Sequence, residues 1–147
     1  MKAMANKEFI NSINYKKQQL RAVRTGAHPD ILKWERNMVK ACKGYSIPVF
    51  AVEMMRTSER QQELYDKGFS QAKAGESYHQ YGAAVDIVHS TKLWDGMTKK
   101  EWRILYEIGH DVARKMNIKL ENGFDWEFYD PAHWQLKDWD GQVFDRP

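Results

Sequence analysis

The apolar positions of this chain change their spacing several times, which predicts a mixture of helices and strands. Residues 7–24 show a weak amphipathic helical pattern among Lys, Gln and Arg. Residues 28–42 predict a second helix with Pro29 in its first turn, and Gly44 is expected to end it. One face of that helix carries Ile31, Trp34, Met38 and Ala41.

The middle of the chain predicts two strands and a helix between them. The run PVFAVEMM indicates the first strand, and TSERQQELYDKG a short helix capped by either Thr57 or Ser58. Residues 69–82 are expected to form a loop, and the run AAVDIVH that follows predicts the second strand.

The clearest helical pattern is TKKEWRILYEIGHDVARKM. Thr98 and Glu101 have the spacing of a capping box, and the apolar residues repeat at helical intervals. The remainder, from residue 118 to 147, is rich in Trp, Phe and Asp and predicts short strands and turns. No internal repeat or linker divides the chain, so 147 residues with 42% hydrophobic content predict a single domain over 1–147.

Charge and cysteine content narrow the class of protein. The net charge of +3 suits contact with an anionic surface such as a cell wall, but it is too small to argue for nucleic acid. A lone cysteine, Cys42, excludes an internal disulfide and a multi-thiolate zinc site. No run approaches the ~20 apolar residues of a membrane span, and no export signal is evident, so we expect a protein held in the cytosol without membrane insertion.

Asp86 interrupts the apolar run AAVDIVH, although burial of an unpaired charge costs several kcal/mol. It must lie at the surface or meet a positive group. His79 precedes it across Gly82, and the distant segment FYDPAHWQL adds Asp130 and His133. Two imidazoles and a carboxylate are a common open zinc set, which would make a buried Asp86 tolerable.

A zinc-bound water is a nucleophile near neutral pH but needs a proton acceptor. Asp130 could take that proton and deliver it to a leaving amine, and Arg56 could bind the carbonyl oxygen or a substrate carboxylate. Each residue also has a structural interpretation, Asp130 in a turn and Arg56 in a salt bridge. Structural roles are expected for His28, His89, His110 and for the aromatic residues Trp102, Tyr106, Trp126 and Trp134.

Three segments taken together resemble a known family. The string SYHQYGAAVD matches the S-x-H-x-x-G-x-A-x-D signature of the VanY-like zinc peptidases, which include D-alanyl-D-alanine carboxypeptidases and phage L-alanyl-D-glutamate endopeptidases. MRTSERQQELY is similar to the family's R-S-x-x-x-Q-x-x-L-Y segment, with threonine in place of serine, and DPAHWQ resembles the segment of the third ligand. The motif-bearing region spans residues 46–136.

This resemblance implies an α+β fold of the LAS-type, hedgehog-like metallopeptidases, with helices around a small central antiparallel sheet that carries one zinc ion. It implies roles for seven residues: His79, Asp86 and His133 as zinc ligands, Asp130 as catalytic acid/base, Arg56 as catalytic and substrate-binding residue, and Ser77 and Gln61 as substrate contacts.

Within the family, the chain resembles the phage enzymes more than the carboxypeptidases. FDWEFYD resembles the G-D-W segment of the phage enzymes, and carboxypeptidases usually carry glutamate at the Asp130 position. The chain departs from the W-G-G-D-W pattern of the phage enzymes with Asn122 and Phe124, which affects the expected shape of the substrate cleft.

We therefore expect a monomeric phage endolysin without a separate wall-binding domain, held in the host cytoplasm until a separate protein permeabilises the membrane. Its substrate would be the peptidoglycan stem peptide. The alternatives are a D-alanyl-D-alanine carboxypeptidase and a catalytically silent zinc domain that binds wall peptides or a protein partner.

Overall fold

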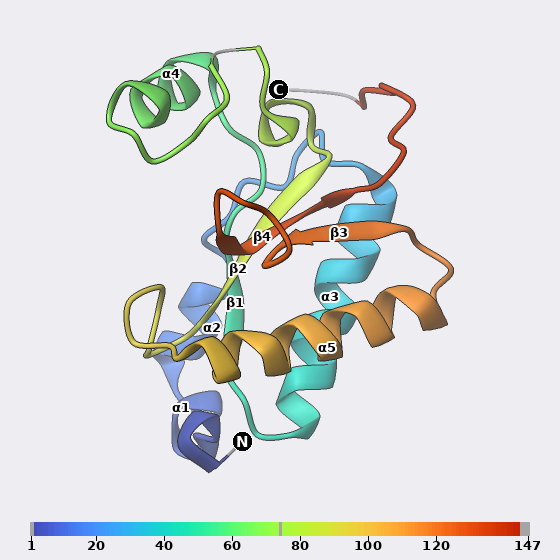
Figure 1. The fold of residues 1–147 in the computed structure, drawn as a ribbon. Helices are drawn as coiled ribbons and strands as arrows, with labels where there is room; N and C mark the ends of the chain where they lie inside the picture. Colours follow the sequence, from blue (N-terminus) through green and yellow to red (C-terminus); the bar gives the residue numbers. More distant parts are fainter. Residues whose placement is uncertain (1, 74, 145–147) are drawn as a thin grey trace.

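A four-stranded antiparallel sheet forms the centre of the molecule in the computed structural model, which describes residues 2–73 and 75–144 (Figure 1). Its spatial order is β1-β2-β4-β3. The strands are β1 (Val49–Glu53), β2 (Ala84–His89), β3 (Leu120–Gly123) and β4 (Asp130–Leu136). The strands that carry Asp86 and His133, β2 and β4, are therefore neighbours although they are far apart along the chain.

Helices surround this sheet, which confirms the expected α+β class. The helical elements are η1 (Lys2–Met4), α1 (Lys7–Ile10), α2 (Ile13–Gln18), α3 (Pro29–Gly44), α4 (Ser58–Asp66), η2 (Tyr78–Tyr81) and α5 (Lys99–Lys115). In the part of the chain that is described, no helix is long and apolar enough to cross a membrane.

The single helix expected over residues 7–24 is wrong. The chain makes two short helices instead, because the Ser12 side chain accepts a hydrogen bond from the N–H of Tyr15 and starts a new helix there. The weak apolar pattern does not mark a core face either, since Ile13 is 63% exposed and Leu20 81% exposed.

The other helix boundaries follow local capping. His28 caps α3, with Pro29 in its first turn, and Thr98 with Glu101 completes the expected capping box of α5. Of the two candidate caps of α4, Thr57 is the one used, because its hydroxyl accepts from the N–H of Arg60. The loop expected over 69–82 instead ends in the short helix η2.

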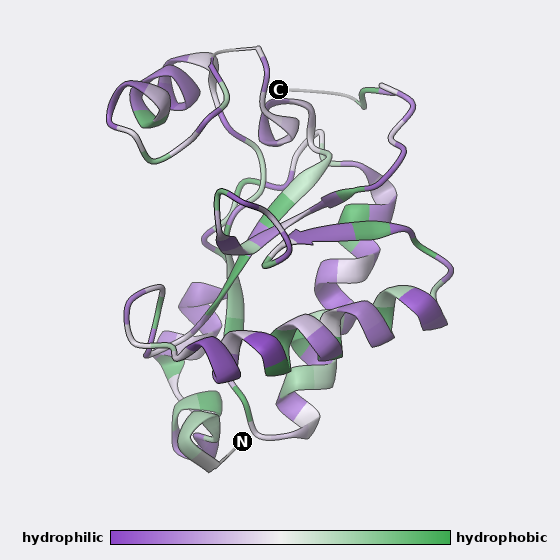
Figure 2. Ribbon diagram, viewed as in Figure 1, coloured by the Kyte–Doolittle hydropathy of each residue, from purple (hydrophilic) through white to green (hydrophobic). Residues whose placement is uncertain are grey.

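The apolar core lies where α3 and α5 pack against the sheet. Trp34 of α3 and Trp134 of β4 are both buried, with ring centroids 4.7 Å apart, and the Trp34 indole donates to the Gly109 carbonyl oxygen at 3.0 Å. A Cβ at Gly109 would lie 2.3 Å from the Trp134 ring, so this helix position must be glycine. Cys42 is buried, as expected of a small apolar residue. Figure 2 shows β1 and β2 largely in the hydrophobic colour and α4 largely in the hydrophilic one.

Candidate metal centre and active site

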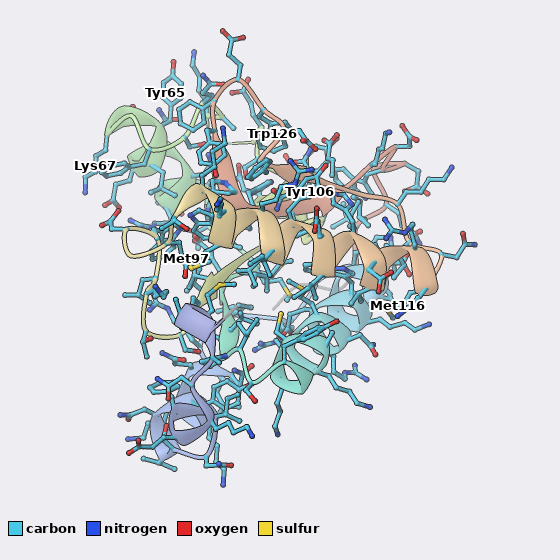
Figure 3. The ribbon with its side chains drawn as sticks, turned by 60° about the horizontal axis from the view of Figure 1, so that its bottom comes forward. Tyr65, Lys67, Met97, Tyr106, Met116 and Trp126 are labelled. Atoms are coloured by element: carbon cyan, nitrogen blue, oxygen red, sulfur yellow. The ribbon has the colours of Figure 1, made fainter. Side chains whose placement is uncertain are left out.

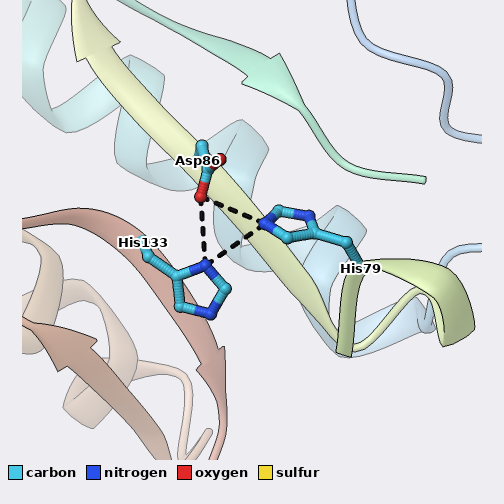
Figure 4. Close-up of side chains that lie close together, drawn as sticks. All are labelled: His79, Asp86 and His133. Atoms are coloured by element: carbon cyan, nitrogen blue, oxygen red, sulfur yellow. Dashed lines mark hydrogen bonds and ion pairs between the residues drawn. The ribbon is translucent and has the colours of Figure 1, made fainter. Parts of the chain in front are cut away.

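Three potential ligand atoms meet on one face of the sheet (Figure 4). Asp86 and His133 are paired directly across β2 and β4, so their side chains are neighbours. Asp86 Oδ1 lies 3.1 Å from His133 Nδ1 and 3.1 Å from His79 Nε2, and the two imidazole nitrogens are 3.2 Å apart. The structure thus brings together the three residues that the sequence suggested as ligands.

His79 reaches this point because η2 is fixed at both ends. The Ser77 hydroxyl accepts from the N–H of His79 and caps the short helix. Gly82 ends it in the left-handed conformation, with φ of 73°, and a Cβ there would lie 2.7 Å from Ala27 Cα. Both the backbone conformation and the close approach require glycine, so the turn predicted between His79 and Asp86 has a clear physical basis.

Neighbouring acceptors fix the tautomer of each histidine. His79 Nδ1 lies 3.0 Å from the Met54 carbonyl oxygen, which can only accept, so this nitrogen carries the proton and Nε2 is left with a lone pair. His133 Nε2 faces Gln135 Oε1 at 2.9 Å, and the Gln135 amide is oriented by donating to Glu121. His133 Nδ1 therefore also presents a lone pair. Such outer contacts are typical of histidines that bind a metal.

The cluster has the donor set and spacing of a metal site. With both imidazoles neutral, two nitrogen lone pairs and a carboxylate oxygen lie 3.1–3.2 Å apart, an arrangement that is repulsive unless a proton or a metal ion lies among them. Ligands at 2.0–2.1 Å from a tetrahedral ion are about 3.3 Å apart, so a divalent cation fits this spacing.

The pKa values of Asp86 and His133 also indicate that the cluster is stabilised by a positive charge. Burial raises the pKa of Asp86, but His79 and His133 outweigh it and hold that pKa well below its ordinary value. Burial lowers the pKa of His133, yet the bond to Asp86 leaves it raised. A proton or a metal ion would satisfy the same three atoms.

Asp130 stands at the start of β4, three residues before His133. Burial, followed by the negative charge of Asp86, raises the pKa of the Asp130 carboxyl to about 6. Gly123 of β3 pairs with Asp130, and the two backbones lie so close that a Cβ at this glycine would overlap the Asp130 carbonyl group. A carboxyl that titrates near neutral pH is suited to both accept and release a proton.

Arg56 is nearly buried and faces several carboxylates. Its Nη2 donates to Glu53 Oε2 at 2.6 Å and lies 3.6 Å from Asp86 Oδ2. Burial lowers the pKa of Arg56, but the hydrogen bond and charge of Glu53 and the charge of Asp86 outweigh it, so the guanidinium is charged. The negative charge of Asp86 in a buried strand is thus offset by the nearby Arg56 and by the proton or metal ion that the two histidines and Asp86 would share.

Gln61 and Ser77 have little surface with which to contact a substrate. Gln61 is fully buried, its Oε1 accepts from Arg56 Nη1 at 2.7 Å, and its amide donates to Ser70 and to the Ala72 carbonyl oxygen. Ser77 is 7% exposed and caps η2. Their positions favour indirect roles, Gln61 holding Arg56 and Ser77 holding His79.

Several residues of the site were missed by sequence reasoning. Met54 and Glu121 act through contacts that no spacing reveals, and Gln135 lies inside the DPAHWQ segment without a motif position of its own. Trp126, expected in the core, is half-buried with its ring 5.2 Å from that of His133. Figure 3 shows it on the same side of α5 as Tyr106.

Asn122, which departs from the W-G-G-D-W pattern of the phage enzymes, has a structural role. Its amide donates to the Pro131 carbonyl oxygen at 3.0 Å, and its Oδ1 accepts from the N–H of Phe124 at 2.7 Å. Asn122 is fully buried and so fixes both ends of the β3–β4 loop that carries Trp126.

Comparison with known proteins places the chain among cell-wall enzymes. No family model matches the chain. It is 30% identical over 128 residues to the peptidoglycan L-alanyl-D-glutamate endopeptidase CwlK of Bacillus subtilis strain 168, covering 74% of this chain and 72% of CwlK.

Solved structures of such enzymes have a similar fold. The fold is similar to that of the L-Ala D-Glu endopeptidase ChiX of Serratia marcescens, with a TM-score of 0.65 and 25% identity over 85% of this chain and 87% of ChiX. A mutant of the D,D-pentapeptidase VanY in complex with Zn(II) is similar with a TM-score of 0.56 and 20% identity, over 75% and 72% of the two chains. The chain therefore belongs to the VanY-like, LAS-type family of peptidoglycan metallopeptidases.

Proposed function

We propose that the protein is a zinc-dependent L-alanyl-D-glutamate endopeptidase that cleaves the stem peptides of peptidoglycan. The observation that carries the proposal is the meeting of three potential ligand atoms on His79, Asp86 and His133, with the outer nitrogen of each imidazole facing an acceptor. Support for the scissile bond comes from CwlK and ChiX, which both bear this activity in their names.

The residues around the centre divide the chemistry between them. When bound, zinc supplies a Lewis acid that polarises a carbonyl group and lowers the pKa of water. Asp130 accepts a proton from the attacking water and passes it to the departing nitrogen, a role that its pKa of about 6 permits. Arg56 contributes positive charge for the carbonyl oxygen as it becomes negative, while Glu53 and Gln61 keep the guanidinium in place.

Mass spectrometry of fragments released from purified peptidoglycan tests this proposal. We expect chelator-sensitive release of stem peptides with a new D-glutamyl N-terminus, leaving L-alanine on the muramic acid. Loss of a terminal D-alanine instead would identify a D-alanyl-D-alanine carboxypeptidase. Stoichiometric zinc without any cleavage would identify a silent binding domain.

The biological setting that we propose is that of a phage endolysin, held in the host cytoplasm until the membrane is permeabilised. It is supported by the resemblance of residues 124–130 to the phage enzymes. Expression in a bacterial cell should leave the culture intact until a permeabilising agent is added, and then cause rapid loss of turbidity. The Asp130→Asn variant should not lyse the cells, and sedimentation analysis should find a monomer.

A further inference from the structure

A cavity of about 370 Å³ lies away from the metal centre, where the C-terminal part of α5 meets the start of β3 and the end of β4. Figure 3 marks this end of α5 by Met116 and the other end by Met97. Four side chains able to carry positive charge line the cavity, together with apolar residues and one acid, Asp138. We name it the basic groove, and its four basic residues are His110, Arg114, Lys119 and Lys137.

Two of these residues form its centre. Lys119 directly precedes β3 and Lys137 directly follows β4. The two residues are neighbours, because the Lys137 N–H donates to the Lys119 carbonyl oxygen at 2.9 Å. Both are exposed, and neither makes an ion pair within residues 2–73 and 75–144. Arg114 adds a third positive charge, shared at 3.3 Å with Asp111. The groove is thus positive with cations free to bind an anion.

His110 adds a partly buried polar ring to the lining of the groove. Its Nε2 is buried without a hydrogen-bond partner in the described chain, and its ring packs 4.4 Å from Tyr106 and 5.1 Å from Trp134. Buried polar atoms are nearly always paired with protein, water or ligand. A residue that lines the groove therefore has a polar atom for which the described chain supplies no partner.

A neighbouring cavity of about 220 Å³ shares the residues Lys119, Lys137 and Asp138 but also contains Asp30 and Asp140. Its mixed charge does not favour an anion. Of the two cavities that share these lysines, only the basic groove has more basic than acidic residues in its lining.

We propose that the basic groove binds the carboxylates of a peptidoglycan stem peptide adjacent to the one being cleaved, an inference that rests on the proposed function. Stem peptides carry free carboxylates, and carboxylate is the anion that such a wall polymer offers to lysine and arginine. Lys137 lies four residues beyond His133, about 13 Å along an extended strand. A polymer held at the metal centre could therefore reach the groove. Binding there raises retention on the wall without taking part in the reaction.

The test compares two double variants of equal charge change. Lys119→Glu/Lys137→Glu reverses the groove, whereas Lys16→Glu/Lys17→Glu reverses two exposed lysines of α2, on the far side of the molecule (Figure 1). Each is measured by sedimentation with purified, teichoic-acid-free peptidoglycan in the cold, before digestion is appreciable. Each is also assayed for hydrolysis of a short soluble stem peptide, and thermal unfolding checks that both variants are folded.

We expect the groove variant to bind peptidoglycan about tenfold more weakly than wild type and to lose most of its salt dependence. Its hydrolysis of the soluble peptide should stay within about twofold, because exposed charges at this distance are screened. The α2 variant should bind like wild type. The milder variant Lys119→Gln/Lys137→Gln should show an intermediate loss.

Three outcomes would contradict the proposed role of the basic groove. The groove variant could bind peptidoglycan like wild type, or the α2 variant could lose as much affinity. The third is that the wild type binds only to a phosphate-rich wall polymer and not to the teichoic-acid-free peptidoglycan. Failure of the proposed function looks different. In that case the wild type would not cleave the soluble peptide, while the groove-dependent binding to peptidoglycan would still be observed.

Discussion

The two faces of the sheet are stabilised in opposite ways, although His133 and Trp134 are consecutive residues of β4. On the face that α3 and α5 cover, Trp34, Trp134 and Gly109 pack closely together, with one hydrogen bond completing the contact. On the metal face, Asp86 and the two histidines bring three potential acceptor atoms together. The packed face is stable by itself, whereas the metal face acquires a favourable charge balance only when it takes up a proton or a metal ion.

This contrast indicates which substitutions should alter the function without altering the stability of the fold. Substitutions on the packed face should lower the free energy of unfolding with or without metal. Substitutions around the cluster should mainly change metal affinity, proton transfer or pH dependence. The following predictions test that separation.

Truncation of a side chain on the packed face should have the largest effect. Trp34→Ala removes a fully buried indole and its bond to Gly109, so the free energy of unfolding should fall by about 3–5 kcal/mol. Urea unfolding should show the same loss in zinc and in chelator. Trp94→Ala, at a 46% exposed tryptophan, is the matched control and should change stability by less than about 0.5 kcal/mol. A loss confined to the chelated protein would refute the separation.

Removal of the acid/base should affect turnover and leave the packing unchanged. Asp130→Asn should reduce kcat on a stem peptide by about 10²-fold or more while the protein still holds one zinc ion. The wild type should lose activity as pH falls through the pKa of Asp130, because the base takes up a proton. That pKa is about 6 from burial and the charge of Asp86, and a cation bound nearby would lower it. A variant with unchanged kcat would remove Asp130 from the mechanism.

The contact that orients His133 should tune metal affinity. Gln135→Met keeps the side-chain length but deletes the acceptor of His133 Nε2, so zinc should bind about 10–100-fold more weakly. Competition with a chromophoric chelator measures this directly. Gln142→Met, at an exposed residue, is the control and should bind zinc like wild type. Equal affinity of the two variants would show that the tautomer of His133 does not depend on Gln135.

The smallest expected effect is a gain in stability. A raised pKa means that folding favours protonated Asp130, so this stabilisation is present at low pH and is lost as pH rises through about 6. Near pH 7 in chelator, Asp130→Asn should therefore unfold at higher denaturant concentration, with a gain on the order of 1–2 kcal/mol. Near pH 4 the gain should vanish. A variant that is less stable at both pH values would contradict the charge assignment.

Local patterns along the chain were enough for the elements that are specified locally. Pro29 and the capping box of Thr98 and Glu101 determine where two helices begin, and the motif around His79 identified the candidate ligands. The pattern failed over residues 7–24, because a single hydroxyl at Ser12 outweighed a weak periodicity.

Tertiary structure decided everything that depends on contacts between distant segments. The pairing of Asp86 with His133 comes from the order of the strands, and the lone pair on each histidine from Met54 and Gln135. Gln61 shows the same limit, since only the structure reveals that it is fully buried and accepts a hydrogen bond from Arg56. Sequence specifies which chemical groups are available, because residue type and local spacing are written in it. Which lone pairs, charges and buried surfaces face each other is settled only when the sheet brings remote segments together.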